Sequence, residues 1–125
     1  MLGDKDAAAN IAVKDLEVAK RFYGETLGLT QVGSEADELI VFRSGNSMIN
    51  VYRSKYAGTN QATALTWVVG EGVESVVEAL KAKGISFEHY DMLEIRREGD
   101  VHIDGNMKVA WFKDPDGNIL NIVSR

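Results

Sequence analysis

The sequence predicts an α+β fold of two tandem βαβββ modules, residues 7–53 and 63–124, within one domain spanning residues 1–125. Two observations carry this prediction. The same order of strand-like and helix-like segments occurs twice, and a polar linker, residues 54–62, separates the two copies. Each module has one helix, which can cover only one face of its sheet. We therefore expect two curved, mixed sheets that enclose a shared cleft, a typical place for a small molecule.

The first module begins with a strand over residues 7–13. Asp15 follows as a candidate N-cap, and apolar residues then recur at helical spacing until Gly28 ends the helix. Residues 29–33, 38–43 and 48–53 favour three further strands, with a hairpin turn at residues 44–47.

The second module repeats this order. Residues 63–69 predict a strand, Val73, Val76, Val77 and Leu80 form a helical stripe, and Gly84 ends that helix. We expect strands at 85–90, 108–113 and 118–123, with the DPDG turn at 114–117 between the last two. The charged segment 93–100 is interpreted as a solvated loop or a lid, and His102 to Asn106 as a polar hairpin or loop end.

Composition excludes several classes of function. The net charge of −5 disfavours binding to the phosphates of nucleic acid, and the absence of cysteine excludes disulfides and thiol catalysis. No apolar run approaches the length of a membrane span, and residues 1–10 lack the features of a secretory signal. These features predict a soluble, cytoplasmic protein that binds neither nucleic acid nor membrane.

Two stretches carry a resemblance to a known family. AVKDLEVAKRFYGETLGL and WFKDPDGNILNIV resemble the glyoxalase / bleomycin resistance protein / dioxygenase group, the vicinal oxygen chelate superfamily. The resemblance covers essentially the whole chain. It implies paired βαβββ modules and a homodimer, and in metal-dependent members it implies four metal ligands, one on each of four strands.

By position, the four ligands of such relatives fall on Ala8, Asn50, Ala64 (or Leu65 if the alignment slips by one residue) and Asn121. None of these is His, Asp or Glu, and alanine cannot donate to a metal. We therefore expect neither a metal nor another cofactor at these positions. The two histidines lie elsewhere, and we expect His89 on a strand in a packing or surface role.

The strands indicate what lines the cleft instead. Side chains alternate between the two faces of a strand. In the strand over residues 7–13, one face therefore carries the small residues Ala8, Asn10 and Ala12. In the strand over residues 63–69, the equivalent face carries Ala64, Thr66 and Val68. The candidate ligand-binding residues are Asn10, Asn50, Thr66, Asn121, Trp111, Tyr90 and Met92. For Trp67, a core position is the expectation. No residue is assigned a catalytic role.

Three functions remain open. The first is a metal-free binding protein that sequesters an uncharged or aromatic small molecule. The second is a glyoxalase-like lyase or isomerase that works without a metal or with a displaced metal site. The third is an accessory protein with a vestigial cleft. A ligand-dependent rise in the melting temperature would separate the first from the third.

Overall fold

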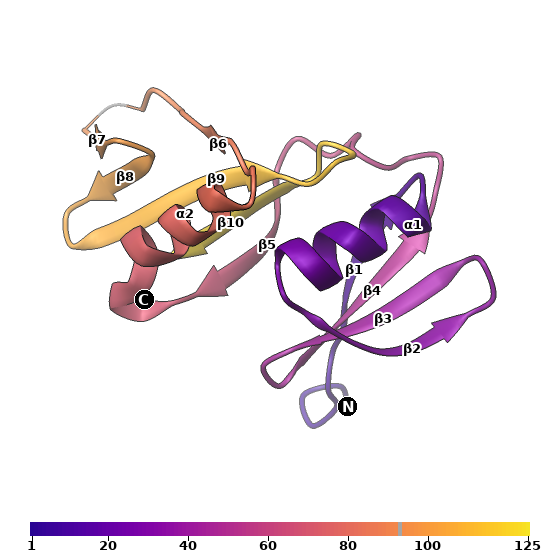
Figure 1. Ribbon diagram of the computed structural model, residues 1–125. Coiled ribbons are helices and arrows are strands. Elements are labelled where there is room, and N and C mark those ends of the chain that lie inside the picture. Colours follow the sequence, from indigo (N-terminus) through magenta and orange to yellow (C-terminus); the bar gives the residue numbers. More distant parts are fainter. Residues whose placement is uncertain (93) are drawn as a thin grey trace. The chain divides into compact units, whose positions relative to one another are not determined.

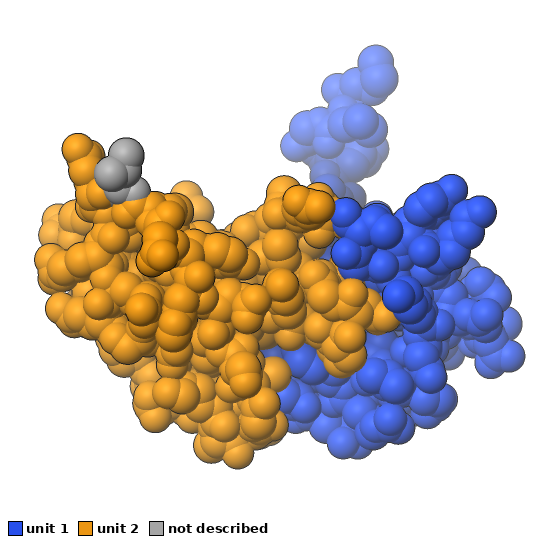
Figure 2. Space-filling view, turned by 90° about the horizontal axis from the view of Figure 1, so that it is seen from above, with its two compact units in different colours: residues 1–59 blue, residues 60–125 orange. Residues whose placement is uncertain are grey.

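The computed structural model describes residues 1–92 and 94–125, and these form two compact units, Met1–Thr59 and Asn60–Arg125 (Figure 2). Each unit contains one sheet and one helical segment that lies against it (Figure 1). The predicted α+β fold with two βαβββ modules is confirmed. No helix within the described ranges has the length and apolar character to cross a membrane.

Unit 1 holds a four-stranded sheet in the order β1-β4-β3-β2. The strands are β1 (Ala9–Val13), β2 (Thr30–Glu35), β3 (Leu39–Ser44) and β4 (Ser47–Arg53), and only the β1–β4 pair is parallel. Helix α1 (Leu16–Ala19) continues as a π-helical segment, Lys20–Thr26. The predicted cap is confirmed, since Asp15 accepts hydrogen bonds from the backbone N–H groups of Glu17 and Val18.

Side-chain alternation gives the unit 1 sheet two different faces. One face carries buried apolar residues such as Ile11 and Val51, and these pack with Phe42 and Tyr23 beneath the helix. The opposite face carries Asn10 and Asn50. We call the face of each sheet opposite its helix the helix-free face.

Unit 2 has a larger sheet in the order β5-β10-β9-β8-β7, with β6 paired to β9. Its elements are β5 (Thr63–Val68), α2 (Val73–Ala82), β6 (Phe87–Glu88), β7 (Arg96–Glu98), β8 (Val101–Asp104), β9 (Met107–Lys113) and β10 (Ile119–Val123). In unit 2, β8 pairs with β9 and so occupies the sheet position that β2, paired with β3, occupies in unit 1.

The prediction for residues 85–104 was partly wrong. The expected strand 85–90 is reduced to the two residues of β6, and the expected loop 93–100 contains β7, although Leu93 lies outside the described residues. The expected hairpin at His102 to Asn106 is confirmed, because β8 and β9 pair antiparallel on either side of a turn at Gly105 and Asn106, but its first residue, His102, is buried.

The core of unit 2 lies between α2 and one face of the sheet. Phe112 is almost completely buried there, with Phe87 edge-to-face at 5.6 Å and Trp67 stacked at 6.4 Å between ring centroids. Trp67 therefore packs on the helix-covered side, but it is half-buried and not fully buried as a core position would imply.

The DPDG segment joins β9 to β10 through a buried carboxylate. Asp114 Oδ1 accepts from the backbone N–H groups of Asp116 and Asn118, at 2.9 and 2.8 Å, and Oδ2 accepts from the Asn118 side-chain amide at 2.7 Å. Gly117 takes a φ of 91°, which the turn requires. The motif therefore has a structural role, because these hydrogen bonds fix the turn from which β10 enters the sheet.

Candidate functional site

Three of the predicted ligand-binding residues form a row on the helix-free face of unit 2. Thr66 of β5 pairs with Asn121 of β10, and Asn121 pairs with Trp111 of β9. Directly opposite residues point to the same face of a sheet. Ala64 lies two residues before Thr66 and therefore shares this face, whereas Leu65 points to the other one.

Asn121 is the unusual member of this row. Its side chain is only 7% exposed, yet its Oδ1 atom is buried and has no hydrogen-bond partner among the described residues. A buried acceptor without a partner costs about 1–3 kcal/mol of folding free energy. Native proteins satisfy nearly all such atoms, with protein groups, ordered water or a ligand.

Trp111 lies beside Asn121 in a fixed orientation. Its indole N–H donates to Thr63 Oγ1 at 3.1 Å. The indole makes edge-to-face contacts with Tyr90, at 5.2 Å and 87°, and with His102, at 4.9 Å and 86°. Three aromatic rings thus cluster next to the unsatisfied amide, and we call Tyr90, His102 and Trp111 the aromatic cluster.

His102 was missed as a member of this site. It was expected in a polar hairpin, but β8 places its side chain on the helix-free face with only 2% exposed. The backbone N–H of Tyr90 donates to His102 Nε2 at 2.9 Å. Burial lowers the pKa of His102, while backbone hydrogen bonding near Val109 and Tyr90 acts in the opposite direction.

The alternation of Val101, His102 and Ile103 between apolar and polar was the available signal for a strand. The polar residues Asp100 and Asp104 on either side favour a hairpin or loop end instead. Nothing local in the sequence indicates the bond from Tyr90, which allows a neutral imidazole to be buried.

The remaining predicted residues are not members of this row. In unit 1, Asn10 and Asn50 are opposite each other, and the Asn50 amide donates to Asn10 Oδ1 at 3.3 Å. Ala8 is exposed just before β1. Met92 is 38% exposed on the segment that follows Tyr90.

A charged cluster lies on another part of unit 2. Asp100 contacts His89 Nε2 at 2.7 Å and Lys81 Nζ at 2.9 Å. Hydrogen bonds from His89 and then Lys81 lower the pKa of the Asp100 carboxyl. His89 is thus an exposed residue beyond the end of β6, and not on a strand as expected, with its ring in contact with Asp100.

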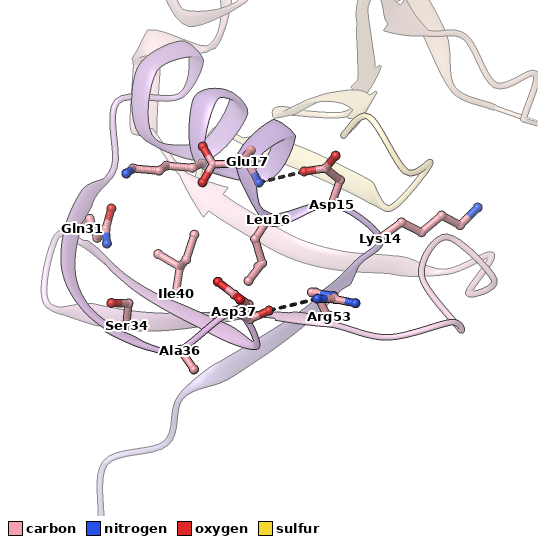
Figure 3. A pocket seen from close by; sticks show the side chains of 11 residues that line it. Lys14, Asp15, Leu16, Glu17, Gln31, Ser34, Ala36, Asp37, Ile40 and Arg53 are labelled. Atoms are coloured by element: carbon pink, nitrogen blue, oxygen red, sulfur yellow. Dashed lines mark hydrogen bonds between the residues drawn. The ribbon is translucent and has the colours of Figure 1, made fainter.

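Unit 1 also contains a groove of about 420 Å³, which the sequence analysis does not predict (Figure 3). Leu16 and Ile40 lie at its centre, with Asp15 on one side and Asp37 and Arg53 on the other. Asp15 caps the helix, and Arg53 donates to the Asp37 carbonyl at 3.4 Å. The groove has charges of both signs at exposed positions, so it favours no one class of ligand.

Comparison with known proteins agrees with this fold. A profile of the glyoxalase/bleomycin resistance protein/dioxygenase superfamily matches residues 7–122. The chain belongs to this superfamily. A comparison with curated proteins gives no match.

Solved structures of other superfamily members have the same fold. A glyoxalase family protein from Enterococcus faecalis is 20% identical, with a TM-score of 0.74 and coverage of 98% of this chain and 99% of that chain. The fosfomycin resistance protein FosX from Listeria monocytogenes, complexed with Mn(II) and dihydroxypropylphosphonic acid, is 15% identical, with a TM-score of 0.71 and coverage of 97% and 90%. A lactoylglutathione lyase from Agrobacterium tumefaciens is 18% identical, with a TM-score of 0.66 and coverage of 96% and 94%.

The resemblance predicts metal ligands at four positions, Ala8, Asn50, Ala64 and Asn121, and the side chains at these positions do not fit a metal ion. Ala8 and Ala64 have no donor atom, and the Asn50 amide already donates to Asn10. In residues 1–92 and 94–125, no three His, Cys, Asp or Glu side chains come together as a metal site would need. No metal chemistry follows from this set of side chains.

Proposed function

We propose that this superfamily member binds an uncharged, planar small molecule through the helix-free face of unit 2, without a metal, and sequesters it. The observation that carries the proposal is the buried Oδ1 atom of Asn121, which has no partner within the described chain. A ligand N–H or O–H group would satisfy this acceptor and recover the free energy that its burial costs.

The surroundings of Asn121 support an uncharged and planar ligand. Thr66 and Trp111, on either side of it in the sheet, carry no charge, and Trp111 offers an aromatic surface whose orientation is fixed by Thr63. Aromatic rings favour flat partners through stacking or edge-to-face contact. An ionic ligand would meet no opposite charge in this row, so its desolvation would not be offset.

Thermal-shift measurement with a library of neutral aromatic compounds tests the proposal. A compound that binds only the folded protein raises the melting temperature, by an amount that grows with its concentration. Asn121→Leu should weaken binding of a compound found in this way by about 1–3 kcal/mol, because it removes the acceptor. Gln61→Leu is the matched control, because Gln61 is an exposed amide of the same unit that belongs neither to this row nor to the groove of unit 1.

Different results would favour the other functions. Equal affinity of wild type and Asn121→Leu would reject the assignment of this face. Absence of any stabilising compound would favour an accessory role. Turnover of a dicarbonyl–thiol adduct, assayed with and without added divalent metal, would identify an enzyme instead.

A further inference from the structure

The aromatic cluster depends on one histidine that the proposed function leaves without a role. His102 touches both Tyr90 and Trp111, with ring centroids at 6.1 and 4.9 Å. It also accepts the Tyr90 backbone N–H at 2.9 Å. Tyr90 lies beyond the end of β6, so this bond ties an irregular segment to strand β8.

The hydrogen bond defines the protonation state of the ring. An imidazole nitrogen that accepts a hydrogen bond carries no proton, so Nε2 is unprotonated and the neutral ring carries its proton at Nδ1. A protonated imidazole has N–H groups at both nitrogens. The Nε2–H would then face the Tyr90 N–H, and two donors cannot bond each other.

The charged side chains around His102 disfavour a second proton, and backbone hydrogen bonding near Val109 and Tyr90 acts in the opposite direction. Arg97 is opposite it on β7, and the charges of Arg97 and His89 both disfavour the imidazolium. Asp100 is already bound by Lys81 and His89. The other titratable groups of neighbouring elements are Glu88, which pairs with Lys113, Lys108, which pairs with Glu74, Arg96 and Glu98 of β7, which pair with each other, and the exposed Asp91 and Asp104.

We propose that His102 is a positioning residue for the ligand-binding face: as a neutral imidazole it holds Tyr90 and Trp111 together, and when protonated it releases them. This inference rests on the proposed function, because it concerns the same face. It makes ligand binding sensitive to mild acid, since protonation breaks the bond to Tyr90 and frees the segment that carries it.

Nuclear magnetic resonance of the full chain without ligand tests the inference. At pH 7, the ¹⁵N shifts of His102 should report a neutral ring protonated at Nδ1. As the pH falls below about 6.5, the ordinary histidine pKa, the Tyr90 amide and the Trp111 indole N–H signals should shift with the same midpoint as His102. His102→Gln, whose side-chain oxygen can accept from Tyr90 without titrating, should abolish this shared transition.

Three results would overturn the inference. One is a neutral ring protonated at Nε2. Another is a transition at Tyr90 and Trp111 that follows His89 and disappears in His89→Gln. The third is acid unfolding with both signals still at their pH 7 positions. If His102→Gln does not fold, the wild-type titration and His89→Gln still decide. Because no ligand is present, failure here leaves the thermal-shift test of the proposed function untouched.

Discussion

Replacement of Asn121 by leucine should remove from the folded state the free-energy cost of a buried, unpaired amide oxygen. The Oδ1 atom of Asn121 is buried without a partner among the described residues, and the side chain is 7% exposed. Leucine has a similar size and no polar atom, so it removes about 1–3 kcal/mol of desolvation cost and adds strain of less than about 1.5 kcal/mol. We expect the free energy of unfolding to stay constant within about 0.5 kcal/mol or to rise by up to about 3 kcal/mol.

Asn118→Leu is the matched comparison. Asn118 is 6% exposed, close to the value for Asn121, but its amide donates to Asp114 Oδ2 at 2.7 Å. Its replacement leaves a buried carboxylate oxygen without that donor, which should cost about 1.5–3 kcal/mol. Two asparagines with equal burial should therefore respond with opposite sign, and the difference comes from their hydrogen bonds alone.

Urea denaturation of protein refolded from denaturant measures both variants without a copurified ligand. Thermal unfolding gives a second measurement, since a change of 1 kcal/mol in the free energy of unfolding shifts the melting temperature of a chain of this size by about 4 °C. A loss of stability in Asn121→Leu as large as that in Asn118→Leu would show that Asn121 Oδ1 has a partner, and would refute the reasoning for the site. Higher stability combined with weaker ligand binding is the usual signature of a functional position.

Four further predictions concern metal, assembly and pH. Purified protein should carry less than about 0.1 equivalent of zinc, nickel, iron or manganese, and chelator should leave its melting temperature unchanged. The variant Ala8→His, Asn50→Glu, Ala64→His, Asn121→Glu should gain metal-dependent stabilisation that wild type lacks, and a folded variant with no such gain would refute the mapping of these positions. Light scattering at micromolar concentration should give a homodimer, and a clean monomer would contradict this. The lowered pKa of His102 means that the unfolded chain takes up its proton first, so the free energy of unfolding should fall as the pH drops through about 6.5, and His102→Gln should reduce this slope.

Most of the fold followed from local patterns. Asp15 and Gly28 delimit the first helical segment as predicted, because capping and positive φ are local requirements. The apolar stripe of α2 and the DPDG turn were also predicted, for the same reason. Alternation gave the faces of β1 and β5, where the bulky residues are more buried than the small ones beside them.

The region between α2 and β9 could not be predicted in this way. Its strands β6 and β7 have two and three residues, too few for alternation to be recognised. The burial of His102 depends on the Tyr90 backbone, twelve residues earlier, and on Trp111 across the sheet. Such contacts between segments override the ordinary preference of a polar side chain for solvent.

The two units differ in how they satisfy the amide on the helix-free face. In unit 1, Asn50 has Asn10 opposite it on the parallel neighbouring strand, and the two side chains bond each other. In unit 2, Asn121 has Thr66 in the same relation, and its Oδ1 atom is left without a partner in the described chain. Trp111 lies next to that acceptor and His102 contacts Trp111, so the ligand site that we propose belongs to unit 2.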